Sequence, residues 1–218
     1  MTTGALISGG KDSWYAAYCA NKKVDFVICV ISDNTDSYMF HTDNIKYVKK
    51  QTQLTESIYI QKETKGKKEE ELKDLENVLS SLGLDELYVG AVASNYQRIR
   101  VEEICEKLNI KCKPPLWGRN DFDLLEEMIE NDFEIIITTV AAGGLSKDFL
   151  GKKINKDTIK GLKKIHKKYE ISPVGEGGEY ETFVLNCPLF ERKLKVKKSK
   201  VTWDKNTRSG TYKILKLE

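Results

Sequence analysis

The stretch "GALISGGKDSWYAAY", Gly4–Tyr18, decides the fold class of this chain. It begins with a short apolar segment, Gly4–Ile7, which predicts a strand, and two glycines, a lysine, an aspartate and a serine follow. The next residues have helical spacing, so we expect a helix over Ser13–Asn21 with Trp14 and Ala17 on one face. A strand, a glycine-rich turn and a helix in this order predict an anion-binding loop that opens an α/β domain.

The turn between this strand and helix has the chemistry of a pyrophosphate site. Gly9 and Gly10 let backbone N–H groups face an anion with no Cβ in the way, and the helix that Ser13 opens favours negative charge at its N-terminus. Lys11 neutralises phosphate charge. Asp12 would repel phosphate unless a cation lay between them, which indicates magnesium with Asp12 as its ligand. The predicted phosphate-binding residues are Ser8, Gly9, Gly10, Lys11, Asp12 and Ser13, with Lys11 also counted as catalytic.

Two better-known phosphate loops do not match this turn. The Walker A pattern needs a glycine where Ala5 stands and a serine or threonine where Asp12 stands. The dinucleotide fingerprint G-x-G-x-x-G is also missing from this turn. The structural alternative is an ordinary strand–turn–helix with an exposed lysine, which six residues of suitable chemistry at one strand–helix junction make the weaker interpretation.

Strands and helices alternate along the first half of the chain. The near-continuous apolar run "VDFVICVIS", Val24–Ser32, is typical of a strand buried on both faces of a parallel sheet. Alternation of this kind predicts an α/β fold with a parallel sheet. Further strands are expected over Ser57–Ile60, Leu87–Ala91 and Ile110–Trp117, and helices over Thr42–Thr55, Lys67–Leu82 and Tyr96–Leu108.

The pattern changes after Trp117, and we place a soft domain boundary near Gly118. The second half predicts a smaller α+β domain. Its helices are expected over Asp121–Glu130, with Asp121 as N-cap, and over Asp157–Tyr169, with Ile159, Leu162, Ile165 and Tyr169 on the inner face. Its strands are expected over Phe133–Ala142 and in a hairpin of Lys193–Trp203 with Tyr212–Leu217.

Composition and charge leave several function classes open and disfavour others. The chain has 218 residues and a net charge of +3, too small to demand a nucleic-acid partner. Five cysteines without a C-x-x-C pair and two histidines argue against a zinc site or a redox pair. With neither a leader pattern nor a long apolar segment in the sequence, we expect a soluble, reduced, cytoplasmic protein.

The C-terminal segment is strongly basic. From Glu191 to Glu218, ten lysines and arginines stand against three acidic residues. We interpret them as the solvated face of edge strands, where lysines discourage aggregation. The alternative is a surface that docks an acidic or RNA-bound partner.

A second informative stretch is "EGGEYET", Glu176–Thr182, which holds three carboxylates and two glycines within seven residues. Once the chain enters a strand, side-chain alternation places Glu179 and Glu181 on one face and Tyr180 on the other. Such carboxylates suit magnesium, an amine or ammonium, or the work of a general base. The structural alternative is a solvated acidic turn. We predict Glu176, Glu179 and Glu181 as catalytic residues.

The loop sequence "SGGKDS" resembles the PP-loop of the N-type ATP pyrophosphatases, which belong to the HUP group of Rossmann-like folds. The resemblance implies that ATP is cleaved between its α and β phosphates while a carbonyl or carboxylate oxygen of the substrate is adenylated. AMP then leaves when a nitrogen or sulfur nucleophile attacks. It also implies a PP-loop ATP-binding domain over residues 1–118 and a substrate-binding domain over residues 119–218.

The acidic stretch, with "NCP" a few residues later, resembles the diphthine–ammonia ligase family within that group. Further stretches that are similar to the family are "FHTDN" (Phe40–Asn44), "YQRIRVEEIC" (Tyr96–Cys105), "PPLWGRN" (Pro114–Asn120) and "AAGGLSKDFLG" (Ala141–Gly151). Asp43 and Asn120 depart from the family pattern, where proline and aspartate are common. The resemblance implies amidation of diphthine, a modified histidine of translation elongation factor 2, with ATP and free ammonium.

The resemblance also implies roles outside the two stretches. ATP would be bound by Ile31 at the end of the second strand, by His41, and by Gly90 and Ala91 after the fourth strand. The substrate-binding residues would be Gln97, Arg98, Gly143, Gly144 and Tyr180. Nucleic acid and membrane are not expected as partners, and a homodimer is possible. Two alternatives stay open: another adenylating PP-loop ligase or tRNA-modifying enzyme, and a non-catalytic module that binds ATP or AMP.

Overall fold

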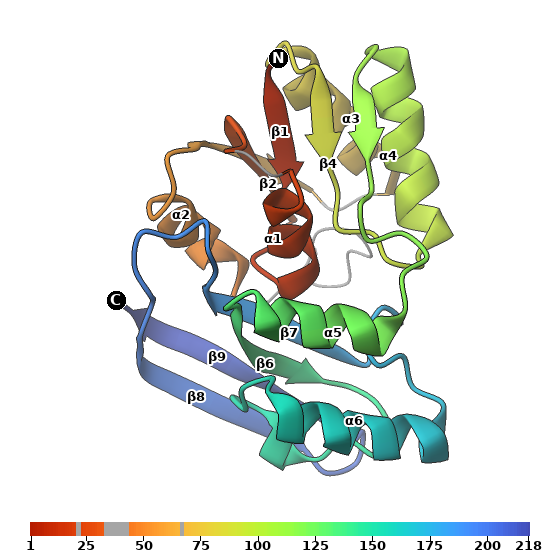
Figure 1. The fold of residues 1–218 in the computed structure, drawn as a ribbon, viewed down its shortest axis with the longest axis vertical. Helices are drawn as coiled ribbons and strands as arrows, with labels where there is room; N and C mark the ends of the chain where they lie inside the picture. Colours follow the sequence, from red (N-terminus) through yellow and green to blue (C-terminus); the bar gives the residue numbers. More distant parts are fainter. Residues whose placement is uncertain (21–22, 33–43, 66–67) are drawn as a thin grey trace. The chain divides into compact units, whose positions relative to one another are not determined.

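The structure is a computed structural model that describes residues 1–20, 23–32, 44–65 and 68–218. These form two compact units, Met1–Trp117 and Gly118–Glu218 (Figure 1). The first unit contains β1 (Thr3–Leu6), α1 (Lys11–Tyr18), β2 (Phe26–Ser32), the 3-10 helix η1 (Ile45–Tyr47), α2 (Val48–Thr52), β3 (Ile58–Thr64), α3 (Lys68–Ser80), β4 (Glu86–Tyr88), α4 (Asn95–Lys107) and β5 (Lys111–Lys113).

The strands of the first unit form a parallel sheet in the order β3-β2-β1-β4-β5. From β1 the chain moves to one side through β2 and β3, and then returns to the other side of β1 to form β4 and β5. The direction therefore reverses between β1 and β4. In open α/β sheets, ligands bind at the carboxyl ends of the strands at such a switch point. The predicted α/β fold with a parallel sheet is confirmed.

The sheet of the first unit is covered on both faces. Ile28 and Val30 of β2 and Leu87 of β4 belong to one hydrophobic cluster with residues of α3 and α4. Val27 and Cys29 alternate with them along β2 and are also fully buried. Burial on both faces explains why β2 is an unbroken apolar run. The helix residues of the cluster are Leu75 and Leu79 from α3, and Val101, Ile104 and Cys105 from α4.

The second unit has an antiparallel sheet in the order β7-β6-β9-β8. It is the α+β arrangement predicted for this part of the chain. Its two α-helices, α5 (Asp121–Glu130) and α6 (Lys156–Tyr169), each bury a short apolar face. The buried apolar residues are Leu124, Leu125 and Met128 on α5, and Ile159 and Leu162 on α6. The elements are α5 (Asp121–Glu130), β6 (Glu134–Val140), the 3-10 helix η2 (Lys147–Phe149), α6 (Lys156–Tyr169), β7 (Tyr180–Asn186), β8 (Val196–Asp204) and β9 (Ser209–Leu217).

Two local predictions for the second unit are wrong. Asn120, and not Asp121, is the N-cap of α5, because its side-chain oxygen accepts hydrogen bonds from the N–H groups of Phe122 and Asp123 at 3.0 and 3.1 Å. Tyr169 was expected on the buried face of α6, but it is 47% exposed. It is the last residue of α6, and its ring still lies beside Gly144.

Two helix predictions for the first unit also change. α1 begins at Lys11, two residues before the predicted start at Ser13, with Gly10 as its N-cap. The helix expected over Thr42–Thr55 is a 3-10 turn followed by the five-residue α2, and Thr42 lies outside the described residues. Within the described part of the chain, no helix is both long enough and apolar enough to cross a membrane.

Candidate functional site

The loop between β1 and α1 has a backbone that requires glycine. Gly9 has a φ of +90°, which lies in the region that L side chains avoid. Gly10 is extended and caps α1 without a side-chain bond, so no side chain of the cap occupies the N-terminus of the helix. This geometry leaves an open helix N-terminus next to the switch point of the sheet, the arrangement that binds phosphate in other proteins.

The loop is held in one shape by its own serines and by α2. The Ser13 hydroxyl donates to the Gly10 carbonyl at 3.0 Å and lies 3.3 Å from the Ser8 hydroxyl. The Gln51 side-chain amide, fully buried, donates to the Gly9 carbonyl at 3.1 Å. A loop braced in this way does not have to be ordered when an anion binds. Gln51 was not predicted from the sequence, since "IKYVKKQT" shows only helical spacing.

Lys11 is buried at the start of a helix, where a cation is electrostatically unfavourable. Its side chain is only 2% exposed, and its Nζ lies 2.8 and 3.0 Å from the two carboxylate oxygens of Asp12. A buried ammonium at a helix N-terminus needs nearby negative charge, and Asp12, 27% exposed, supplies it here. The pair therefore marks a place where anionic groups are stabilised.

Gly90 lies beside this loop, at the carboxyl end of β4. A Cβ atom at Gly90 would come within 2.7 Å of the backbone carbon of Asp12 and of the Ser13 nitrogen. The sequence interpretation was that a small residue admits the nucleotide here. The structure gives a different reason for glycine, because the backbone of α1 itself occupies the space. Ala91, which follows, is buried, and the roles of both residues in ATP binding stay predictions.

Of two further residues predicted to bind ATP, Ile31 is described by the structure and His41 is not. Ile31 is the second-last residue of β2. It pairs with Glu63 of β3 and is partly buried. This position is at the carboxyl edge of the sheet, as the prediction requires. His41 lies outside the described residues.

Arg98, predicted to bind substrate, is fixed at the start of α4. Its guanidinium carbon lies 4.3 Å from the centre of the Trp117 ring, and Nη1 lies 2.8 and 2.7 Å from the carboxylate oxygens of Glu102. The cation–π contact and the two charge-assisted bonds from Nη1 together hold the guanidinium in place. The stretch "PPLWGRN" contains Trp117, but nothing in it predicts that the Trp117 ring contacts Arg98. The side chain of the neighbouring Gln97 lies outside the described part of the structure.

Glu179, in the acidic turn of the second unit, is a hydrogen-bond acceptor for its own loop. One carboxylate oxygen accepts from the Ser172 N–H at 2.7 Å, and the other accepts from the Gly177 N–H at 2.8 Å. Backbone bonds to a carboxylate are among the stronger hydrogen bonds in proteins. The structure therefore shows Glu179 holding the turn closed, and its catalytic role stays a prediction.

Tyr180 points into the second unit. It is 3% exposed, and its hydroxyl donates to the Pro173 carbonyl at 2.6 Å. Its main chain lies so close to Gly175, which has a φ of +76°, that a Cβ there would approach the Tyr180 carbonyl oxygen to 2.6 Å. As expected, Tyr180 is directed away from the partly exposed side of β7, and its predicted contact with substrate stays untested by this geometry.

Glu181 is the partly exposed carboxylate of β7. It pairs in register with Thr139 of β6, whose hydroxyl donates to the Glu181 carboxylate at 3.1 Å. Glu176 is also partly exposed, and its backbone N–H donates to the Ser172 hydroxyl at 3.3 Å.

The glycines after β6 have structural reasons of their own. Gly144 has a φ of +86°, and a Cβ there would lie 2.4 Å from the ring of Tyr169. Gly143 makes only an ordinary contact with the same ring, with a Cβ distance of 3.6 Å. The predicted role of both in substrate binding is not decided by these contacts.

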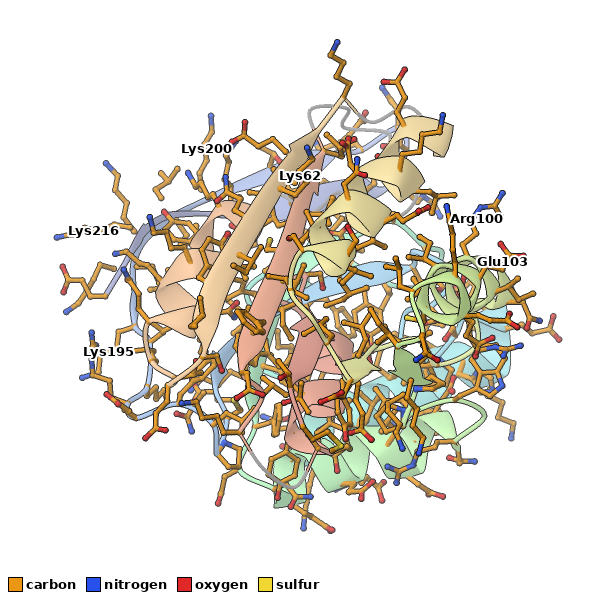
Figure 2. All side chains as sticks on the ribbon, turned by 90° about the horizontal axis from the view of Figure 1, so that it is seen from above. Lys62, Arg100, Glu103, Lys195, Lys200 and Lys216 are labelled. Atoms are coloured by element: carbon orange, nitrogen blue, oxygen red, sulfur yellow. The ribbon has the colours of Figure 1, made fainter. Side chains whose placement is uncertain are left out.

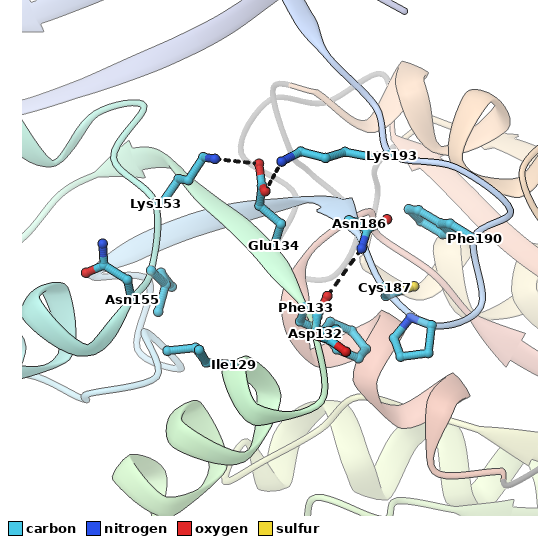
Figure 3. A pocket seen from close by; sticks show the side chains of 12 residues that line it. Ile129, Asp132, Phe133, Glu134, Lys153, Asn155, Asn186, Cys187, Phe190 and Lys193 are labelled. Atoms are coloured by element: carbon cyan, nitrogen blue, oxygen red, sulfur yellow. Dashed lines mark hydrogen bonds and ion pairs between the residues drawn. The ribbon is translucent and has the colours of Figure 1, made fainter.

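A separate pocket of about 580 Å³ lies in the second unit at the other end of β6 (Figure 3). Glu134 stands at its centre and pairs with Lys153 at 2.9 Å and with Lys193. Burial by itself raises the pKa of Glu134, but the hydrogen bonds from Lys193 and Lys153 outweigh it and hold the pKa below its ordinary value. The Glu134 carboxylate therefore offsets part of the positive charge of the two lysines.

Metal ligands do not gather anywhere in the described part of the chain: no group of three or more His, Cys, Asp or Glu side chains that could hold an ion is present there. A loop with a single carboxylate matches the way magnesium is bound with phosphates, through one or two carboxylates and the substrate's own oxygens. Asp12 fits such a site.

A parallel sheet with a braced, glycine-containing loop at its switch point defines a Rossmann-like nucleotide-binding fold. Comparison with known families is more specific. The family model of the diphthamide synthase N-terminal domain matches residues 1–112, and that of the C-terminal domain matches residues 120–218. The chain belongs to the diphthamide synthase family.

Curated relatives agree with this assignment. Proteins named diphthine–ammonia ligase from Bos taurus and Homo sapiens are each 37% identical over 227 residues, which cover 92% of this chain and 85% of the relative. The one from Saccharomyces cerevisiae is 31% identical, covering 86% of this chain and 33% of that longer protein. A solved structure titled as a predicted subunit of tRNA methyltransferase from Methanocaldococcus jannaschii matches 86% of this chain and 98% of its own, at 16% identity and a TM-score of 0.47, too distant to support an argument.

Proposed function

We propose that this chain is a ligase that amidates diphthine on translation elongation factor 2, using ATP and free ammonium. The observation that carries the proposal is the buried Lys11–Asp12 pair at the open N-terminus of α1, in a chain of the diphthamide synthase family. The names of the curated relatives support the same reaction. Products are diphthamide, AMP and pyrophosphate.

The first unit holds ATP in this proposal. The β and γ phosphates lie against the loop, where the N–H groups of Gly9 and Gly10 and the N-terminus of α1 face them. Lys11 then shares its ammonium between phosphate and Asp12, so the charge that is unfavourable at a helix N-terminus becomes part of the site. Ser8 and Ser13 keep the loop in shape.

Magnesium is part of the proposal through Asp12. Asp12 together with phosphate oxygens would hold the ion, which would supply positive charge against the pyrophosphate leaving group. Asp12 is partly exposed, so solvent reaches its side chain.

The diphthine carboxylate attacks the α phosphate and displaces pyrophosphate, which gives an acyl-adenylate. Lys11 and the helix N-terminus stabilise the charge that develops on the leaving group. Ammonia then attacks the acyl carbon, and AMP leaves. Arg98, whose guanidinium lies over the Trp117 ring, is the proposed partner of an anion such as a carboxylate or the α phosphate.

Ammonium has to lose a proton before it attacks. Glu181 and Glu176 are the proposed groups for binding ammonium and accepting this proton, since both are partly exposed carboxylates of the acidic stretch. Glu179 shapes the turn that presents them. In this proposal residues 1–118 form the ATP-binding domain, residues 119–218 form the substrate-binding domain, and the protein works in the cytoplasm.

The proposal is tested with purified chain, ATP, isotopically labelled ammonium and elongation factor 2 that carries diphthine. We expect pyrophosphate release that depends on all three substrates, and labelled nitrogen in the modified histidine by mass spectrometry. Release with tRNA in place of the factor would instead indicate a tRNA-modifying PP-loop enzyme. ATP binding without any release would indicate a nucleotide-binding module.

A further inference from the structure

Gln51 is the least exposed polar residue in the part of the chain that the structure describes, at 0%. Charged side chains such as those of Glu103, Lys200 and Lys216 instead extend away from the ribbon at the surface (Figure 2). Burying an amide side chain costs free energy unless a hydrogen bond replaces the lost water. The bond from its Nε2 to the Gly9 carbonyl, at 3.1 Å, meets this requirement across 42 positions of sequence. It ties α2 to the loop between β1 and α1.

This bond orients a neighbouring N–H group as well as the carbonyl. A trans peptide is planar, and its N–H points in the direction opposite to its C=O. The Gly9–Gly10 peptide is trans, so the bond from Gln51 to the oxygen leaves the Gly10 N–H directed away from Gln51. The contact of this N–H with the Ser8 hydroxyl is long, at 3.5 Å, which is the limit of a hydrogen bond. The Gly10 N–H therefore keeps most of its capacity to donate to an anion.

The peptide between two glycines needs a restraint of this kind. Gly9 and Gly10 have no Cβ, so the peptide that joins them rotates at a small steric cost. Half a turn would point the Gly9 carbonyl oxygen to the place where the Gly10 N–H now points, and an anion there would be repelled. The serines of the loop restrain a different peptide, because the Ser13 hydroxyl bonds to the Gly10 carbonyl. The hydrogen bond that holds the Gly9 carbonyl comes from Gln51.

The helix that carries Gln51 is short, but its own packing holds it in place. Val48 and Thr52 are buried together with Gln51, and the Thr52 hydroxyl donates to the Val48 carbonyl at 2.9 Å within α2. A donor on a packed element is placed more accurately than one on a loop. A glutamate of the same shape would not serve, since an ionised carboxylate accepts hydrogen bonds and does not donate them. The amide is therefore the group that this position requires.

We propose that Gln51 is a positioning residue of the phosphate site: by holding the Gly9 carbonyl, it directs the Gly10 N–H toward the β and γ phosphates of ATP. The inference rests on the proposed function for the identity of the ligand. Gln51 acts through the loop and does not itself touch the nucleotide. The affinity of the loop for phosphate then depends on α2, an element that the sequence of the loop does not contain.

The test measures binding of α,β-methylene-ATP with magnesium, because the bridge between its α and β phosphates is not cleaved and turnover is not involved. Gln51→Leu keeps the approximate size of the side chain and removes the donor. We expect the Kd of the analogue, measured by isothermal titration, to rise about tenfold in this variant. Thr52→Val is the matched control, since it removes a buried hydroxyl of α2 whose bond stays within the helix. It should change the Kd less than about twofold.

AMP gives the measurement that separates positioning from general support of the fold. It lacks the β and γ phosphates, so Gln51→Leu should change the Kd of AMP less than about twofold. An equal loss for AMP and the analogue, or an equal loss in Thr52→Val, overturns the inference. So does a Gln51→Leu variant that binds the analogue as the wild type does, or a wild type that does not bind it. If Gln51→Leu does not fold, judged by circular dichroism, Gln51→Met replaces it with the same expectations.

Failure of the proposed function is seen separately. A wild-type chain whose binding of the analogue depends on Gln51, but which shows no ATP- and ammonium-dependent amidation of the elongation factor, removes the function and keeps the positioning role. A chain that amidates the factor while Gln51→Leu binds the analogue normally removes the positioning role and keeps the function.

Discussion

The loop after β1 and the turn before β7 use similar residues for different purposes. Both contain two adjacent glycines and a carboxylate, and both have a glycine with positive φ, Gly9 in the loop and Gly178 in the turn. In the loop, the Asp12 carboxylate meets an ammonium. In the turn, the Glu179 carboxylate is used by two backbone N–H groups. Adjacent glycines next to an acidic residue therefore indicate a backbone with a positive φ angle. Whether a ligand can bind there depends on which group the acidic side chain already contacts.

The largest effect is expected in the loop, from Lys11→Ala. Loss of the ammonium removes the charge that faces the phosphates, so we expect pyrophosphate release to fall by about 10²–10³-fold and ATP binding to weaken. Isothermal titration with ATP and a pyrophosphate assay measure both. Lys49→Ala, an exposed lysine of α2, is the control and should behave as the wild type. Full activity of Lys11→Ala would remove the loop from the proposed site.

The turn is tested by Glu179→Ala. We expect ATP binding to be spared and the amidated product to be lost, with the second unit destabilised by about 1.5–3 kcal/mol because two backbone N–H groups lose a charged acceptor. Thermal unfolding separates the two effects when compared with Glu179→Gln, which keeps one acceptor. Stability restored without activity would indicate chemistry at Glu179, and both restored together would indicate a purely structural residue. Unchanged activity in Glu179→Ala contradicts the assignment of the acidic turn.

A smaller effect is expected from Gly90→Ala. The new Cβ would lie 2.7 Å from the backbone of Asp12 and Ser13, so α1 has to shift. We expect ATP affinity to fall about tenfold and stability to fall by about 1–3 kcal/mol. Gly178→Ala is the matched control in the turn, since nothing lies within 4 Å of its Cβ position and only backbone strain is added. An ATP affinity equal to that of the wild type would show that the loop tolerates displacement.

The smallest effect is expected away from both regions, at Glu134. Its pKa is lower in the folded chain than the ordinary value, so its contribution to stability is present above the unfolded pKa and is lost as pH falls through the folded pKa. Glu134→Gln should therefore destabilise the chain by about 1 kcal/mol near neutral pH and by less as pH falls below about 4.5. Urea unfolding at several pH values measures this. A difference that does not change with pH would mean that Lys153 and Lys193 do not act through charge.

The sequence was sufficient to predict the fold class and the glycine turn between β1 and α1. Alternating apolar strands and helices predict a parallel sheet because each element must bury one face, and β2 needs to bury two. Gly9, Gly10 and Lys11 were identified because their chemistry is local: a turn that needs positive φ and a cation next to it lie within a few residues. For the same reason the hairpin of β8 and β9 was predicted with the correct pairing of its arms.

What the sequence alone did not reveal depends on contacts between distant residues. Gln51 braces Gly9 from 42 positions away, and α1 occupies the space beside Gly90. Trp117 supports Arg98, and lysines of two strands face one another across β8 and β9. Each depends on where the chain returns in space, and residue type alone does not encode this. The sequence by itself determined that a glycine turn with a neighbouring lysine follows β1, because backbone freedom and charge are properties of neighbouring residues; that this loop binds phosphate stays a prediction. The tertiary structure decided which carboxylates and lysines are already partnered, because packing brings those partners together.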